Sequence, residues 1–393
     1  MKRRGFIAAA AAAAASGVSA PSRAQIAPGP PVQTQRYLPQ INIAVNVTLS
    51  GPLQKYGQEV VKGVQAAVDE QNRFNTLLSN VWGMRTYDDR NDPGVAASNA
   101  NVAAADFNCI GVIGNLTAPM TLAALSRYAN VGFALIVPTV TADAVTKRGY
   151  HNVYRLPARD STSGRLFAGV ALDGKRGVTA IAVAFDGDYG SEVASGFVAQ
   201  AQNDHHPADV LLFPLAKTDP VQAARTVLDR SPGYVFLAGK TTELGPVAEA
   251  MRTAGYTGEF GAADGFYNSE TISNYAKTLK GAYVASPMPP LDRVPSAVQL
   301  VTDFEREVSQ ITTQSAFGYA AAQLIIAASQ RGNATSRSGL IRSLQAGGTF
   351  TTLVGQFAFN ISGDPLIPNI YLYTVDADGF KFARPAVRNG FVY

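Results

Sequence analysis

The stretch from Ile41 to Asn72, INIAVNVTLSGPLQKYGQEVVKGVQAAVDEQN, contains the unit from which the fold is built. Its first part, Ile41–Val47, is short and mostly apolar, which predicts a strand. After a turn containing Ser, Gly and Pro, apolar residues recur at helical spacing on one face of a helix that ends near Asn72. These residues are Val60, Val61, Val64, Ala67 and Val68. A strand followed by an amphipathic helix is the repeating unit of α/β proteins.

The same alternation continues along the chain in two runs. Further strands are predicted at Val81–Tyr87, Ile110–Ile113, Phe133–Val137, Val178–Phe185, Val210–Phe213, Tyr234–Ala238, Glu259–Ala262, Gln356–Asn360 and Ile370–Val375. Further helices are predicted at Met120–Asn130, Tyr189–Gln202, Val221–Asp229, Leu244–Ala254, Ser296–Val308, Ser315–Ala328 and Ser336–Leu344. Another helix should begin at Asp92-Pro93, because Asp caps a helix N-terminus and Pro fits its first turn. Two such runs predict two α/β lobes with parallel sheets covered on both faces.

The composition excludes several classes of protein. The chain has 393 residues, of which 47% are hydrophobic and 16% are charged. It is therefore neither disordered, nor a coiled coil, nor a polybasic nucleic-acid binder. The one cysteine, Cys109, excludes an intrachain disulfide framework, and three histidines leave little material for a zinc site. Because Cys109 lies beside an apolar strand, we expect it to be a buried, unreactive side chain.

Residues 1–24 have the pattern of an export signal. Lys2-Arg3-Arg4 forms a basic start, a short apolar stretch follows, and Ser22-Arg23-Ala24 is a plausible cleavage site. Arg3-Arg4-Gly5-Phe6-Ile7 also resembles a twin-arginine signal, so the export route stays open. The Pro-rich residues 25–40 are expected to be a linker. Without residues 1–24 the chain carries 29 basic and 29 acidic residues, so the net charge of +4 does not indicate an anionic partner. We expect a periplasmic protein.

Motifs for catalysis and for metal binding are missing. The sequence contains no GxxxxGK[ST] phosphate loop and no HExxH, GxSxG or CxxC motif. His205-His206 lies in a polar turn, and Asp376–Gly379 lacks the later ligands of a calcium loop, so we expect a hairpin turn there. We therefore expect neither an enzyme nor a bound metal or cofactor.

Polar loops follow several of the predicted strands. Ligands of open α/β sheets bind at the carboxyl ends of the strands, where such loops meet. The loops are Thr48–Pro52 with Tyr56-Gly57, Gly114–Ala118, Pro138–Thr141, Tyr189-Gly190 and Asp264-Gly265. The loop Pro138–Thr141 opens a helix whose free amides suit a carboxylate. Together these loops indicate a binding protein.

The order of the motifs resembles that of a known family. These motifs are Leu49-Ser50-Gly51-Pro52, Tyr56-Gly57, Tyr87-Asp88-Asp89, Asp92-Pro93, Val112-Ile113-Gly114, Thr146-Lys147-Arg148-Gly149-Tyr150, Tyr189-Gly190, Tyr319-Ala320-Ala321 and Asp378-Gly379. From Ile41 to Lys381 the chain resembles the type 1 periplasmic binding proteins of the leucine/isoleucine/valine-binding family, which serve ABC importers.

The resemblance implies two Rossmann-like lobes joined by three hinge crossovers, near Arg155–Ser161, Ser286–Pro290 and Asp364–Asn369. Lobe 1 would consist of residues 41–156 and 288–366, and lobe 2 of residues 157–287 and 367–393. In this family the lobes close about the hinge on a small-molecule ligand and present it to a membrane permease. We expect a monomer with no nucleic-acid partner.

The resemblance also implies ligand-binding positions. Thr141 matches a threonine that holds the ligand carboxylate, whereas Ala118 replaces a serine with the same role. Asp264, with Gly265 beside it, matches the acid that holds the ammonium. Tyr56, Tyr189 and Tyr319 match aromatic walls, and Lys240 replaces a further aromatic residue. Asn91 and Thr117 match the positions of the family's disulfide, so the loop at Thr117 is not cross-linked here.

Two ligand classes stay open. In the first, the ligand is an amino acid of the branched-chain or related type, and Asp264 binds its ammonium while Thr139, Thr141 and backbone amides bind its carboxylate. In the second, Lys240 binds an aromatic carboxylate, an amide or another small acid. Lys240 could also pair with Asp264 or lie in solvent at the rim of the site.

A second functional class also fits the sequence. Type 1 lobes can act as periplasmic ligand sensors that transmit closure to a membrane signalling protein. Permease and ATPase genes beside this gene would favour transport.

Overall fold

The computed structural model describes residues 40–73, 80–293 and 311–386. The export signal, nearly all of the linker and the helix expected at Ser296–Val308 lie outside these ranges. The first sheet has the strand order β2-β1-β3-β4-β5, and all its strands are parallel. The strands are β1 (Gln40–Val47), β2 (Val81–Asp88), β3 (Cys109–Gly114), β4 (Ala134–Val137) and β5 (Val153–Arg155).

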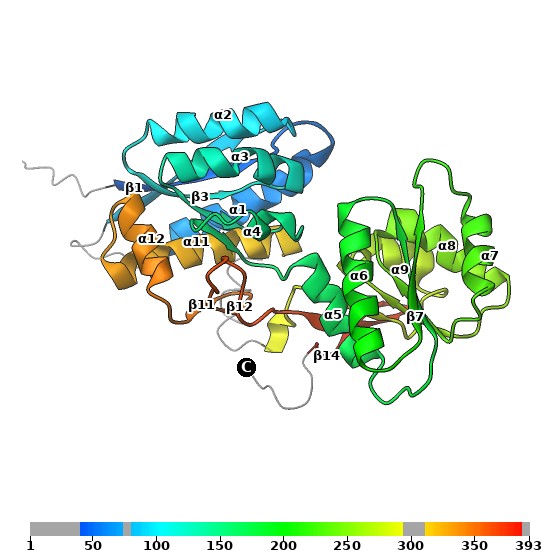
Figure 1. Ribbon diagram of the computed structural model, residues 1–393. Coiled ribbons are helices and arrows are strands. Elements are labelled where there is room, and N and C mark those ends of the chain that lie inside the picture. The colour runs from blue at the N-terminus through cyan, green and yellow to red at the C-terminus, as the bar shows by residue number, and fades with distance from the viewer. Residues whose placement is uncertain (1–39, 74–79, 294–310, 387–393) are drawn as a thin grey trace, which may run out of the picture. The chain divides into compact units, whose positions relative to one another are not determined.

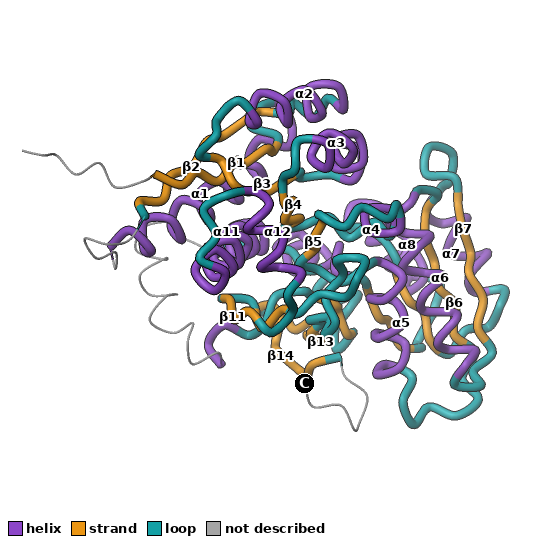
Figure 2. The backbone as a smooth tube through the Cα atoms, turned by 60° about the vertical axis from the view of Figure 1, so that its left-hand side comes forward, coloured by secondary structure: helices purple, strands orange, loops and turns teal. Residues whose placement is uncertain are grey.

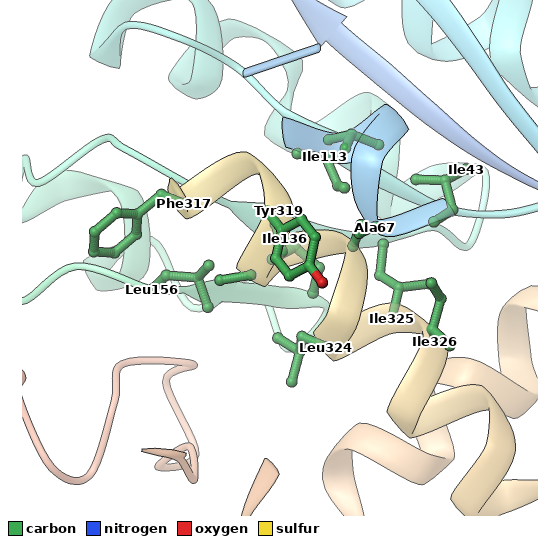
Figure 3. Packing of buried hydrophobic residues seen from close by; sticks show 14 of the residues in the cluster. Ile43, Ala67, Ile113, Ile136, Leu156, Phe317, Tyr319, Leu324, Ile325 and Ile326 are labelled. Atoms are coloured by element: carbon green, nitrogen blue, oxygen red, sulfur yellow. The ribbon is translucent and has the colours of Figure 1, made fainter. Parts of the chain in front are cut away.

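Helices cover both faces of this sheet, as Figures 1 and 2 show. They are α1 (Gln54–Arg73), α2 (Pro93–Ala104), α3 (Ala118–Asn130), α11 (Thr313–Gly332) and α12 (Arg337–Gln345). One hydrophobic cluster joins α1, α11 and α12 to one face, and Figure 3 shows part of it. A second cluster joins α2 and α3 to the other face and includes Cys109, whose pKa burial raises to about 12. The expectation that Cys109 is buried is confirmed.

The second sheet has the strand order β14-β13-β10-β9-β8-β6-β7. Its strands are β6 (Ala180–Phe185), β7 (Ala208–Phe213), β8 (Tyr234–Leu237), β9 (Glu259–Ala262), β10 (Tyr283–Ser286), β13 (Tyr371–Asp376) and β14 (Gly379–Pro385). The five strands from β6 to β10 run parallel, and β13 and β14 add an antiparallel hairpin at one edge. The hairpin turn expected at Asp376–Gly379 is therefore confirmed.

Helices cover both faces of the second sheet as well. They are α5 (Asp160–Ala171), α6 (Asp188–Asn203), α7 (Pro220–Leu228), α8 (Thr241–Thr253) and α9 (Ser269–Tyr275). Successive residues of β6 point to opposite faces: Ala182 packs in the cluster with α5 and α6, and Val183 packs in the cluster with α7 and α8. The predicted α/β fold with two parallel-sheet lobes is confirmed.

Short elements complete the described chain. They are η1 (Gly51–Leu53), α4 (Ala144–Lys147), η2 (Asp264–Phe266), η3 (Leu291–Arg293), β11 (Phe350–Thr352) and β12 (Gly355–Phe357). The prediction of a closing strand at Gln356–Asn360 is wrong, because β12 pairs only with β11 in a separate two-stranded hairpin. By contrast, the helix start at Asp92-Pro93 is confirmed: the Asp92 side chain accepts a hydrogen bond from the amide of Val95.

The chain passes between the two sheets three times: between β5 and α5, between β10 and α11, and between β12 and β13. Each of these passages contains one of the predicted crossovers, whereas the exact lobe boundaries stay a prediction. No helix in the described part of the chain is both long and apolar enough to span a membrane.

A fully buried arginine joins two of these passages. Arg155 at the end of β5 has an exposed fraction of 0%, and its guanidinium lies 3.0 Å from Asp364 in the passage before β13. It also donates to the carbonyl oxygens of Thr141 and Ala142, at 2.6 and 2.7 Å. Thr146 bonds both members of the pair. The loop after β4 is thereby fixed to the first and third crossovers.

Candidate ligand-binding site

A cavity of about 630 Å³ lies where loops of the two α/β lobes meet. The lobe with the first sheet contributes α1, the loop after β4 and the start of α11. The lobe with the second sheet contributes the starts of α6 and α8, η2 and the loop leading into α9. The lining residues are Tyr56, Pro138, Thr139, Thr141, Pro157, Tyr189, Lys240, Thr241, Thr242, Asp264, Gly265, Tyr267, Asn268, Ser269, Glu270, Pro287, Thr313, Gln314 and Phe317. Parallel sheets commonly place binding sites at these loops.

Most of the predicted site residues come together in this cavity. The seven that line it are Tyr56, Thr139, Thr141, Tyr189, Lys240, Asp264 and Gly265. They come from five separate loops or helix starts, so only the fold brings them together. Whether each of them contacts a ligand stays a prediction.

Tyr319 is an exception, and the expectation that it faces the ligand is wrong. Its side chain is 2% exposed and packs in the core between α11 and the first sheet, where Figure 3 shows it near Ile136. Its hydroxyl donates to Glu70 on α1. Two residues along a helix point in very different directions, and it is Phe317 on α11 that lines the cavity. The resemblance therefore identified the helix but not the residue.

Thr117 and Ala118 are not among the residues that line this cavity, and their role as ligand contacts stays a prediction. Ala118 is the first residue of α3 and Thr117 is its N-cap. On the side of the first lobe, the polar part of the cavity lining comes from the loop after β4, where Thr139 and Thr141 lie. The Thr139 hydroxyl is buried and has no hydrogen-bond partner among the described residues.

Asp264 is held in the cavity by Tyr189. Asp264 begins η2, directly after β9, and its Oδ1 accepts a hydrogen bond of 2.5 Å from the Tyr189 hydroxyl. That hydroxyl in turn accepts the amide of Gly265 at 2.9 Å. Burial raises the pKa of Asp264, while the bonds from Tyr189 and the backbone oppose this effect. Gly265 is required here, because a Cβ would lie 2.4 Å from the carbonyl oxygen of Gly239.

Lys240 has a carboxylate partner other than Asp264. Its ammonium lies 3.2 Å from Glu243 one turn along α8, and its side chain is 63% exposed. The alternative that Lys240 pairs with Asp264 is therefore wrong. No lysine or arginine of the described segments forms an ion pair with Asp264, so its carboxylate remains available to a cationic ligand.

Asp160 is a candidate site residue that the sequence analysis missed. It is the first residue of α5, is 1% exposed, and its Oδ2 has no hydrogen-bond partner among the described residues. Together with Thr141 and Asp264 it lines a narrow crevice beside the cavity. Burial, and next the charge of Asp264, raise the pKa of Asp160 well above its usual range. An acid in the first turn after a crossover was the available signal, but α5 itself was not predicted.

Comparison with protein families supports the motif-based resemblance. A family model described as periplasmic binding protein matches residues 40–380, which is nearly all of the described chain. The chain belongs to this family. Within the described residues, this periplasmic binding protein has no group of three His, Cys, Asp or Glu side chains placed to hold a metal ion.

Individual relatives agree with the type 1 resemblance. The binding protein is 24% identical to Leu/Ile/Val-binding protein homolog 1 of Brucella melitensis over 86% of its own chain and 91% of the relative. Its fold is similar to that of a leucine-binding protein from Thermotoga maritima, with a TM-score of 0.75, 20% identity and coverage of 88% and 98% of the two chains. A solute-binding protein of R. palustris in complex with benzoate gives a TM-score of 0.71 at 17% identity, with coverage of 88% and 96%.

Proposed function

We propose that this periplasmic binding protein is the substrate-binding component of an ABC importer and that it binds an amino acid of the branched-chain or related type. The observation that carries the proposal is Asp264, a carboxylate in the cavity that is hydrogen-bonded by Tyr189 and has no cationic partner in the described chain. A partly buried carboxylate of this kind is strongly stabilised by a cation. The ammonium group of an amino acid supplies that cation.

The rest of the cavity suits the other parts of an amino acid. The unpartnered hydroxyl of Thr139 offers a hydrogen bond to the α-carboxylate. Tyr56, Tyr267 and Phe317 line the same cavity and offer apolar and aromatic surface to a hydrocarbon side chain. The ligands of the relatives in Brucella melitensis and Thermotoga maritima, as their names state them, are of this class.

A second candidate is an aromatic carboxylate. The similar fold of the benzoate-bound protein from R. palustris favours it, as does Ala118, which lacks the hydroxyl that the resemblance leads us to expect. Against it, Asp264 would repel a carboxylate, and the one lysine in the lining, Lys240, already pairs with Glu243. We therefore place the amino acid first.

The biological setting follows from the proposal. The protein is exported to the periplasm, works as a monomer, and closes about its three crossovers when ligand binds. A permease in the membrane then accepts the closed form. The protein binds its ligand without converting it chemically.

A thermal-shift screen of the protein without residues 1–24 tests this function. We expect branched-chain amino acids to raise the melting temperature, because a ligand at a hundred times its dissociation constant adds about 2.7 kcal/mol of stability. Benzoate and 4-hydroxybenzoate serve as the competing class. Stabilisation by these aromatic acids alone would replace the amino-acid proposal with the second candidate.

A further inference from the structure

A narrow crevice beside the cavity contains two carboxylates. It has a volume of about 10 Å³ and is lined by Thr141, Pro157, Ala158, Asp160, Ser163, Asp264, Ser286, Pro287 and Ile370. A space of this size accommodates one group about as large as a water molecule. A primary ammonium group has this size. Because Thr141 and Asp264 line both spaces, a ligand in the cavity can extend its ammonium into the crevice.

The crevice offers several hydrogen-bond acceptors, among them oxygens of two carboxylates. Asp160 Oδ2 is buried and has no partner among the described residues. Asp264 uses Oδ1 for the Tyr189 hydroxyl, which leaves Oδ2. Thr141 lines both spaces, and its hydroxyl oxygen can accept a hydrogen bond. These three acceptors match the three N–H donors of a primary ammonium.

Nearby cations do not neutralise Asp160. The charged and titratable groups that face it are Asp264 on η2, Glu192 and Tyr189 on α6, and Arg155 on β5. Arg155 directs its guanidinium to Asp364, to Thr146 and to two backbone carbonyls, and it makes no ion pair with Asp160.

The protonation state of Asp160 follows from these surroundings. Its immediate neighbourhood is acidic, and burial raises its pKa well above the usual range. The raised pKa favours the protonated carboxyl group as long as no cation is bound beside it.

We propose that Asp160 is a second carboxylate for the ligand ammonium and that the ammonium displaces the proton of its carboxyl group on binding. This inference rests on the proposed function, because it concerns the same site. The ammonium keeps its three protons, and the displaced proton leaves to the solvent. The site is thereby selective for primary amines, since a methylated nitrogen is larger than the crevice and has fewer N–H donors.

The exchange gives binding a defined pH dependence. Affinity should rise with pH between the pKa of Asp160 in the complex and its higher pKa in the free protein, because binding releases a proton over that interval. Stability of the ligand-free protein should change in the opposite direction. A folded-state pKa above the unfolded value means that stability falls as pH rises through this window. The asparagine in Asp160→Asn cannot ionise, so the variant avoids this loss of stability at high pH. It should therefore melt higher than the wild type at pH 8, with a smaller difference at pH 4.

Calorimetry with L-leucine, L-isoleucine and L-valine in two buffers measures the exchange directly. Tris and phosphate differ strongly in ionisation enthalpy, so the difference in binding heat gives the number of protons released. For the wild type we expect a release of up to one proton per ligand near neutral pH. Asp160→Asn should release almost none and should bind about 30-fold more weakly or worse. Glu192→Gln, which changes another acid facing Asp160, is the matched control and should keep the release.

The outcomes separate the two proposals. If the amino acids bind but Asp160→Asn leaves affinity and proton release unchanged, the role of Asp160 is overturned and the proposed function stands. If Glu192→Gln abolishes the proton release and Asp160→Asn retains it, the released proton comes from Glu192, and the inference is also overturned. If none of the three amino acids binds the wild type, the proposed function fails and the inference fails with it.

Discussion

Asp264→Asn is expected to weaken amino-acid binding by about 2–5 kcal/mol, the usual cost of truncating one member of a buried charge pair. The substitution keeps the shape of the side chain, and the amide oxygen can still accept from the Tyr189 hydroxyl. What it removes is the negative charge opposite the ligand ammonium, and it places two N–H donors where acceptors are needed. The loss should therefore appear in affinity rather than in folding.

Isothermal titration of both proteins with L-leucine measures this loss. Glu249→Gln is a suitable control, because Glu249 is an exposed acid on α8 that does not line the cavity. The control separates loss of the Asp264 contact from a general change in surface charge. If the Asp264→Asn protein binds leucine as tightly as the control, the Asp264 carboxylate does not bind the ligand ammonium.

Asp364→Asn is expected to lower the free energy of unfolding by about 3–5 kcal/mol, because it leaves a buried arginine charge without its partner. Arg155 is fully buried and lies 3.0 Å from Asp364, which also accepts from Thr146 at 2.8 Å. Burial lowers the pKa of Arg155, and the charge of Asp364 is the largest of the effects that raise it again.

Urea unfolding of the ligand-free protein checks this expectation. The exposed ion pair of Asp209 and Arg230, at 3.9 Å, provides a matched control. Asp209→Asn should change stability by less than about 1 kcal/mol, because exposed pairs contribute little. If Asp364→Asn costs no more than Asp209→Asn, the buried pair does not hold the crossovers together.

The strands and helices with strong apolar patterns could be predicted from sequence, and those with weak patterns could not. β9 has the predicted bounds, and β6 and α6 lie within two residues of theirs. By contrast, α5 packs on α6 through small residues: a Cβ on Gly164 would lie 2.0 Å from the carbonyl oxygen of Val193. A face that requires glycine shows little apolar periodicity, so the helix was missed. β10 was not predicted either.

The residues of the site also divide into those that could be predicted from the sequence and those that could not. Residues at the carboxyl ends of strands, such as Thr141 and Asp264, could be predicted because the sheet topology places those ends together. Tyr319 could not be placed, because the direction of a side chain on α11 depends on how the helix is rotated against α1. Asp160 acquires its role only through burial beside Asp264, which lies far from it in sequence.

The central claim is that the cavity recognises the ammonium group of an amino acid. Calorimetric titration of the wild-type protein with L-leucine and with 4-methylpentanoate tests it most directly, since the second compound keeps the carboxylate and the hydrocarbon chain and lacks only the ammonium. The account predicts that leucine binds and that 4-methylpentanoate binds about 30-fold more weakly or worse. Equal affinity for the two compounds would contradict it.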